Sequence, residues 1–501
     1  MRFLTAVLLL GCIPASAFAE RWDIGLTQTG VRIEATAVAG SSVASPTVLL
    51  IGGLAGNDES ARDTAEEIQA FESVRQDRRP FRLLAIPLAN PDRGKLQFPP
   101  SGIGYRENPE SHALWRWIAI QAPDLVLIAG SDDSGLSGAL STNAVAGVGR
   151  IPARRVDAKA GGLLRTVPRE IPPSEARREI ERRLRRSPRQ LAAELAQVYG
   201  HDFNQLTYIP GMALIGQLRM GRVADVERLA SPYVNGSRNT LDRANSLTLA
   251  GHMVFAELAD RTGDPRYAEL VRKAADLGFT ESGAMKESMP FHDEMSDSVF
   301  MAIPILAAAG KITGESKYFE MAARHLSFMQ KLVLRPDGLY RHSPLTDAAW
   351  GRGNAFPALG LILTLSEFPR SHPAFPGILE AFRQHMAALA PYQDEGGMWR
   401  QVIDHSGSYP EYSATAMIAT ALLRGINNGW LDPDIYQPLV DKAWRAIAAR
   451  TASDGRLMNV SESTNKQRSL SDYLRRAAIL DRDARGGGMA LIFATEMAGM
   501  E

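Results

Sequence analysis

The feature that most constrains the fold is a repeated helical unit in the last 300 residues of the chain. Segments that combine a cap, a turn and an amphipathic helix begin at Thr262, Thr313, Ser371 and Asp432, at spacings of 51, 58 and 61 residues. Apolar helical stretches such as "SVFMAIPILAAAG" precede them. A unit of this length holds two helices and two loops, so about 300 residues hold about six hairpins. Six hairpins can close into a toroid or remain an open solenoid, and the richer apolar content of the first helix in each pair favours closure.

The first third of the chain follows a different pattern. Apolar runs of strand length, "TVLLIGG", "FRLLAIPL" and "DLVLIAG", alternate with helical stretches, which is typical of a parallel sheet built from βαβ units. With 501 residues the chain exceeds the usual size of one core. We therefore expect an α/β domain at residues 20–160, a basic helical linker at 161–195 and an all-α domain at 196–501.

The N-terminal residues resemble a secretory signal. Arg2 is followed by a short apolar run and by "AFA" before Glu20, so residues 1–19 are predicted to be a signal peptide cleaved after Ala19. Reading "LLGC" at Cys12 as a lipid-attachment box is the alternative. Cleavage after Ala19 would leave a mature protein without cysteine. No later apolar run reaches about 18 residues, so we expect an exported protein without a membrane span.

The overall charge argues against a polyanionic partner. The 56 basic and 56 acidic residues cancel, which leaves no global field for nucleic acid. The basic run "SEARREIERRLRRSPRQ" has no interleaved aromatic residues, so we interpret it as a solvated helix face. A charged substrate would have to be bound by local groups.

Unusual polar and aromatic residues gather in the loops that lead into the apolar helices. Asp297 directly precedes "SVFMAIPIL", where it could simply cap the helix. His342, Trp350 and Trp399 could likewise be anchors between loop and core. Arg352 beside Trp350 would suit an anionic sugar, because a guanidinium pairs with a carboxylate and an indole stacks on a pyranose.

These loops resemble those of glycoside hydrolase family 105, the unsaturated rhamnogalacturonyl hydrolases, and its relative family 88, the unsaturated glucuronyl hydrolases. The likeness covers residues 199–501. It rests on "MSDSVFMAIPILA", "DGLYRH", "WGRGNAF", "YQDEGGMWRQVID", "YPEYSATAMIATALLRGINNGWLD" and "DRDARGGGMALIFATEM", in that order. The resemblance implies an (α/α)6 barrel, in agreement with the hairpin count.

The resemblance also implies an activity and a set of site residues. The substrate would be an unsaturated oligosaccharide left by a polysaccharide lyase, and the reaction would be hydration of its C4=C5 vinyl ether without a cofactor. Asp297 would be the general acid and base. The residues expected to bind substrate are His342, Trp350, Arg352, Trp399 and Asp242.

The sequence departs from this family pattern at three places. Met295 stands where the family carries a tryptophan, and Phe356 ends the "WxRxxGW" motif. The second acidic position falls near Leu247, and Asp242 is the nearest carboxylate. A carbohydrate-binding protein that has lost catalysis is therefore the alternative function.

The N-terminal domain resembles the zinc carboxypeptidases of the M14 family through "IGGLAGNDES", "IPLANPDRG", "YRENPES" and "PDLVLIAGSD". Ala55 and Asp58 stand where the family has its first two zinc ligands, and "AGSD" lacks the later histidine. A catalytic zinc needs three protein ligands, so we expect no metal and a truncated, degenerate peptidase fold. Asn90, Asp92 and Arg106 remain from the family pattern.

Overall fold

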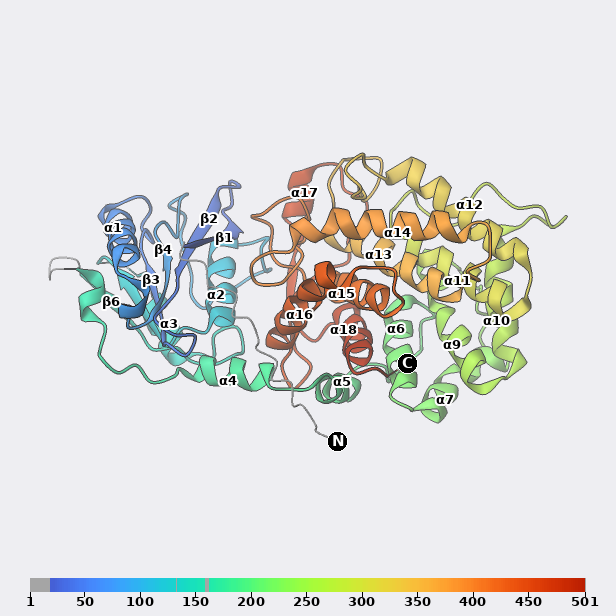
Figure 1. Ribbon diagram of the computed structural model, residues 1–501, viewed down its shortest axis with the longest axis horizontal. Helices are drawn as coiled ribbons and strands as arrows, with labels where there is room; N and C mark the ends of the chain where they lie inside the picture. Colours follow the sequence, from blue (N-terminus) through green and yellow to red (C-terminus); the bar gives the residue numbers. More distant parts are fainter. Residues whose placement is uncertain (1–18, 132, 158–161, 501) are drawn as a thin grey trace, which may run out of the picture.

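The structure is a computed structural model that describes residues 19–131, 133–157 and 162–500. A sheet domain and a helical domain lie side by side along the long axis of the molecule (Figure 1). The predicted signal peptide falls on residues 1–18, outside the described residues, apart from Ala19. Within the described ranges, none of the helices has the length and apolar composition that crossing a bilayer requires.

The sheet domain is built on a mixed sheet. In the described part of the chain it has six strands in the order β1-β2-β4-β3-β5-β6. The parallel members are β3, β4, β5 and β6, whereas β1 and β2 pair antiparallel at one edge. The strands are β1 (Glu20–Leu26), β2 (Arg32–Val38), β3 (Thr47–Ile51), β4 (Arg82–Ile86), β5 (Leu125–Ala129) and β6 (Ala153–Val156).

The three apolar runs of the sequence are the strands β3, β4 and β5, as predicted. Leu49 pairs with Leu84 on one side and Val126 on the other, and all three side chains are buried. Continuous apolar runs suit strands that are covered on both faces. The antiparallel edge was not predicted, because β1 and β2 alternate polar and apolar residues and lack such a run.

Helices cover both faces of the sheet. One core contains side chains of α1 and one set of strand residues, and a second core contains α2, α3 and the opposite set. The helices are α1 (Glu59–Ser73), α2 (Pro109–Gln121) and α3 (Leu136–Thr142).

The basic segment differs from the prediction of a solvated linker. Helix α4 (Glu175–Leu184) packs on α2 and on α16 (Pro433–Arg450), and α5 (Pro188–Ala196) packs on α18 (Ala484–Met497). Arg183 and Arg186 are buried and donate hydrogen bonds to carbonyl groups of residues 448–451. These arginines join the domains, and α5 belongs to the helical core, so the boundary lies before residue 188 rather than at 196.

The helical domain is a closed ring. Within the described residues, six inner positions follow one another around the ring, and α18 returns to contact α6. This closure excludes the open solenoid. The inner helices are α6 (Tyr208–Arg219), α8 (Ser246–Gly251) continued by α9 (Met253–Thr262), α11 (Ser298–Thr313), α13 (Gly351–Glu367), α15 (Tyr412–Asn427) and α18.

The amphipathic helices lie outside this ring, as predicted from the repeat. Each packs against an inner neighbour and turns its polar face to solvent. The outer helices are α7 (Val223–Val234), α10 (Pro265–Ala275), α12 (Ser316–Val333), α14 (Phe375–Leu389) and α16, with α5 as the outer partner of α18.

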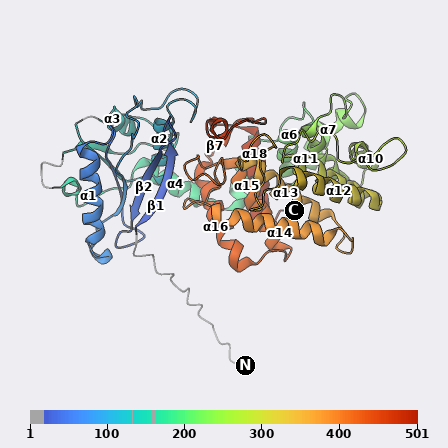
Figure 2. The same cartoon turned by 90° about the horizontal axis from the view of Figure 1, so that it is seen from above.

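A short segment between α16 and α18 departs from the hairpin pattern. It contains β7 (Leu457–Ser461), α17 (Leu470–Leu474) and β8 (Ala478–Asp481). In both views it lies at the face of the barrel that meets the sheet domain (Figures 1 and 2). We call residues 462–477, which connect the two strands, the strap.

Candidate active site

Three loops that precede inner helices meet at one end of the barrel. The backbone N–H of Ser296 donates to His342 O at 3.0 Å, and that of Gly351 donates to Gln401 O at 2.7 Å. The Ser296 hydroxyl donates to Gly353 O at 2.6 Å. These bonds connect the starts of α11 and α13 and the loop before α15, so residues far apart in sequence share one site.

Asp297 occupies the N-cap position of α11 without capping it. Its backbone is already helical, with φ −50° and ψ −32°, and its side chain accepts no cap hydrogen bond. Its Oδ1 instead lies 3.2 Å from His342 Nε2. The alternative of a simple capping carboxylate is therefore wrong, and the carboxylate faces the neighbouring loop.

The site contains buried polar atoms that lack partners. Asp297 Oδ1, His342 Nε2 and Trp350 Nε1 have no hydrogen-bond partner among the described residues, since the 3.2 Å approach of the first two is not aligned as a hydrogen bond. The ring centroids of His342 and Trp350 are 4.5 Å apart, so the three atoms belong to one cluster. Buried polar atoms are normally paired, and a cluster of unpaired ones is suited to binding a ligand.

Gly353 makes this close approach possible. A Cβ at this position would lie 3.0 Å from Trp350, 3.1 Å from Ser296 Oγ and 3.3 Å from His342. Any other residue would push these side chains apart.

The loop before Asp297 is strained and firmly anchored. Phe291, Asp293 and Glu294 have φ values of 64°, 48° and 55°, a region that costs non-glycine residues energy. His325 accepts the Met289 N–H at Nδ1 and contacts Ser298 Oγ through Nε2 at 3.0 Å. Burial lowers the pKa of His325 to about 3, so this imidazole is neutral and serves as an anchor.

Trp350 lies in the site but not as the predicted stacking surface. Its side chain is 1% exposed and its ring contacts both His342 and the Arg352 guanidinium, 4.8 Å from the ring centroid. The ring is covered by protein, which excludes stacking on a pyranose. What it offers is the unpartnered indole N–H.

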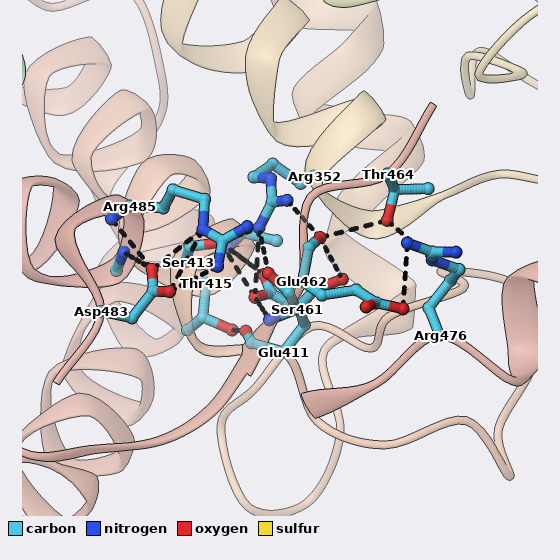
Figure 3. A network of polar contacts seen from close by, with 12 residues as sticks. Arg352, Glu411, Ser413, Thr415, Ser461, Glu462, Thr464, Arg476, Asp483 and Arg485 are labelled. Atoms are coloured by element: carbon cyan, nitrogen blue, oxygen red, sulfur yellow. Dashed lines mark hydrogen bonds and ion pairs between the residues drawn. The ribbon is translucent and has the colours of Figure 1, made fainter. Parts of the chain in front are cut away.

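Arg352 is held by the protein rather than open as a clamp (Figure 3). It donates to Ser413 Oγ, Ser461 O and Glu462 O at 2.8–3.2 Å and is 3% exposed. Of the five N–H donors of a guanidinium, two remain without a partner in these bonds. Arg352 thus supplies positive charge next to Trp350, with limited room for a bidentate pair.

Two other predicted residues lie outside this cluster. Trp399 is fully buried and its Nε1 donates to Leu389 O at 2.8 Å, so it is a core anchor and not a substrate-binding residue. Asp242 is exposed on the turn before α8. In the described part of the chain, no hydrogen bond or ion pair joins the Asp242 carboxylate to Asp297 or His342.

The structure adds two residues that were not predicted. Glu411 is fully buried, caps α15 and accepts bonds from Ser413 Oγ, Ala414 N and Ser461 N, with Arg352 4.0 Å away. Its place directly before an apolar helix is a signal that could have identified it as a cap. Tyr473, on α17, places its hydroxyl 2.7 Å from His342 Nδ1, and burial raises its pKa to about 12.

The retained residues of the sheet domain are already bonded within the protein. The Asn90 amide donates to Leu54 O and Gly94 O, while Asp58, which stands at an expected zinc-ligand position, caps α1. Asp92 accepts from Thr29, and Arg106 pairs with Glu462 of the strap. Among the described residues no group of three or more His, Cys, Asp and Glu side chains is arranged to hold a metal ion.

Comparison with known proteins identifies the helical domain. The chain is 28% identical over 272 residues to the unsaturated rhamnogalacturonyl hydrolase YesR of Bacillus subtilis (strain 168), covering 50% of this chain and 76% of YesR. It is 27% identical over 238 residues to an unsaturated 3S-rhamnoglycuronyl hydrolase of Alteromonas sp. (strain LOR), covering 44% of this chain and 56% of that relative.

Solved structures agree on the fold. A possible member of the GH105 family from Salmonella enterica superposes with a TM-score of 0.53 at 20% identity, covering 62% of this chain and 94% of that one. A family 88 glycosyl hydrolase from Bacteroides vulgatus superposes with a TM-score of 0.52 at 17% identity, covering 63% of this chain and 100% of that one. The sequence model of Glycosyl Hydrolase Family 88 matches residues 223–501, more than half of the chain. The chain therefore belongs to Glycosyl Hydrolase Family 88 and is a glycoside hydrolase.

Proposed function

We propose that this protein removes terminal unsaturated uronate residues from oligosaccharides produced by a polysaccharide lyase, with Asp297 as general acid and base. The observation that carries the proposal is the position of the Asp297 carboxylate. It does not cap α11 and lies 3.2 Å from His342 Nε2, in a cluster of polar atoms without hydrogen-bond partners. The activities named for the relatives in Bacillus and Alteromonas support the same substrate class.

The reaction needs only one carboxylic acid and water. Asp297 gives its proton to C4 of the C4=C5 bond, and water adds to C5 while one of its protons returns to the Asp297 carboxylate. The product carbon C5 carries a hydroxyl and the ring oxygen, which makes it a hemiketal. Breaking the C5–O5 bond leaves a hemiacetal at C1, and its collapse releases the rest of the chain.

The neighbouring residues would orient the sugar. The Trp350 indole N–H can donate to a sugar oxygen at the reacting end, because Nε1 has no protein partner, while the His342 ring lies beside the Asp297 carboxylate. Arg352 would favour the uronate carboxylate by its charge, through the donors that Ser413, Ser461 and Glu462 do not occupy.

We further propose that the sheet domain is a metal-free, carboxypeptidase-like domain that supports the barrel, and that the protein is exported. Ala55 and Asp58 support the loss of zinc, and the bond between Arg106 and Glu462 supports a role in packing. The "AFA" before Glu20 supports export, and a mature N-terminus at Glu20, read by sequencing of the exported protein, tests it.

The test is the loss of ultraviolet absorbance from the conjugated uronate during incubation with lyase products. Asp297→Asn should lower kcat by about 10²–10⁴-fold, the range that general acid–base catalysis contributes. The matched control is Asp432→Asn, at the start of the outer helix α16, where asparagine caps as well as aspartate. Pectin, glycosaminoglycan and other uronate polymers each supply a set of products for the screen.

The alternative is a carbohydrate-binding protein without turnover. It is favoured by one observation, the exposure of Asp242 on its turn, away from the position expected for a second acid. Tight binding of the oligosaccharides with no change in absorbance would establish it. Equal activity of Asp297→Asn and wild type would show that Asp297 is not the acid.

A further inference from the structure

Tyr473 reaches the candidate site from the strap, 131 residues beyond His342 in the sequence. Its side chain is fully buried, and its ring meets the His342 ring edge to face, with centroids 5.6 Å apart at 75°. The Gln401 amide donates to Tyr473 O at 2.7 Å, which holds α17 against the loop before α15. The hydroxyl thus has a fixed position 2.7 Å from His342 Nδ1.

A count of protons sets the direction of this hydrogen bond. The Tyr473 oxygen accepts the backbone N–H of Gln467 at 3.2 Å, and the hydroxyl forms a second hydrogen bond, of 2.7 Å, with His342 Nδ1, which can accept its proton. A phenol carries one proton, and burial, followed by the nearby Asp297 charge, raises the pKa of Tyr473 to about 12. The proton is therefore present at neutral pH and is donated to His342 Nδ1.

This hydrogen bond determines the protonation of the other ring nitrogen of His342, Nε2. When Nδ1 of a neutral imidazole accepts, the only ring proton is on Nε2. Nε2 lies 3.2 Å from Asp297 Oδ1, a contact that needs only a small rotation to become a hydrogen bond. Catalytic hydrogen bonds often align only when substrate is bound. Asp297 Oδ1 then faces a donor, and a proton on this carboxyl group resides on Oδ2.

We propose that Tyr473 is a positioning residue that fixes the Nε2–H tautomer of His342 and so directs the acidic proton of Asp297 to Oδ2, toward the sugar. This inference rests on the proposed function, because it assigns Tyr473 a part in the same reaction. It also gives the strap a function. The strap carries Tyr473 to His342, and its Glu462 carbonyl accepts a hydrogen bond from Arg352.

The test is Tyr473→Phe, which keeps the ring and removes only the hydroxyl. Its matched control is Tyr409→Phe, which removes another buried hydroxyl that bonds to the strap, at Ala477 O, without contact to His342. We expect kcat of Tyr473→Phe to fall roughly 10- to 100-fold, the scale of losses caused by misplaced catalytic groups, with KM nearly unchanged. Tyr409→Phe should retain wild-type kcat.

A spectroscopic readout separates this inference from the proposed function. In protein labelled with ¹⁵N-histidine, the His342 signals are those missing from His342→Gln. We expect a protonated Nε2 and an unprotonated Nδ1 in wild type, and a population with protonated Nδ1 in Tyr473→Phe. Unchanged tautomers, or a kcat loss no larger than that of Tyr409→Phe, would overturn the inference. Absence of turnover in wild type would refute the proposed function, while the tautomer measurement would still decide the role of Tyr473.

Discussion

The sheet domain and the helical barrel both contain the polar side chains expected of a family site, but they leave them in different states. In the sheet domain Asn90, Asp92 and Arg106 are bonded to other parts of the protein. In the barrel Asp297 and His342 keep buried polar atoms without partners. A buried polar atom that lacks a partner costs free energy, and a cluster of such atoms beside a carboxylate is suited to binding a ligand. The contrast favours the barrel as the domain that binds a ligand.

Acidification should distinguish the two domains most strongly. Burial lowers the pKa of His252 to about 4 and of His325 to about 3, and it also lowers that of His385, all in the barrel. The sheet domain has His112, whose pKa burial lowers to about 4. The pKa of these histidines in the unfolded chain is about 6.5. Below that pH the unfolded chain binds protons that the buried imidazoles of the folded chain do not bind, so stability falls from pH 6.5 toward pH 4 and 3.

The expected loss at pH 5 is about 2 kcal/mol for each of His252 and His325, relative to neutral pH. Amide hydrogen exchange of peptides from α8, α9 and α12, compared with those from β3, β4 and β5 at pH 7 and pH 5, measures it. The barrel peptides should lose more protection after correction for intrinsic exchange rates. If the sheet peptides open first, the buried imidazoles do not set the acid sensitivity of the barrel.

Paired glycine substitutions should separate function from stability. Gly353→Ala places a Cβ between Trp350, Ser296 and His342, so we expect kcat to fall on the order of 100-fold through misplacement of the site. Gly52→Ala, after β3, places a Cβ against Thr64 and the Ser60 carbonyl, and should cost about 1–3 kcal/mol of stability.

Activity assays and thermal unfolding of both variants measure these effects. Gly52→Ala protein that remains folded should keep the wild-type kcat. A similar loss of stability without loss of activity in Gly353→Ala would mean that the cluster tolerates displacement, and the contrast between the domains would then be smaller than proposed.

The parts of the molecule that could be predicted are those governed by local pattern. The repeat of amphipathic helices predicted the ring, and the continuous apolar runs predicted the strands β3, β4 and β5. Both predictions succeed because the period of apolar residues indicates which faces of an element are buried. Composition predicts that Arg183 and Arg186 are solvated, because it cannot show that a charged side chain ends on buried carbonyl groups. Only packing of α4 against the barrel decides that.

The candidate site shows the same limit. Asp297 and His342 could be placed together through a resemblance in their loops, since those loops precede equivalent helices. The bonds of Arg352 depend on Ser461 and Glu462, at the end of β7 and the start of the strap, more than 100 residues away in the sequence. Tyr473 carries no local signal for its role, because its position is set by long-range pairing of β7 and β8 and by the sheet domain beside them.

The smallest expected effect tests whether the sheet domain acts on the site at all. Arg106 pairs with the Glu462 carboxylate, which also binds Arg476 at 2.9 Å, while Glu462 O accepts from Arg352. Because the Arg106 side chain is 40% exposed, Arg106→Ala should change stability by less than about 1 kcal/mol and kcat by roughly 2- to 5-fold. Arg32→Ala is the control, since Arg32 also joins the domains, through Ser406, but does not contact the strap. Equal kcat values for the two variants would limit the sheet domain to packing. A loss confined to Arg106→Ala would show that this side chain of the sheet domain helps to hold the strap in place beside the candidate active site of the barrel.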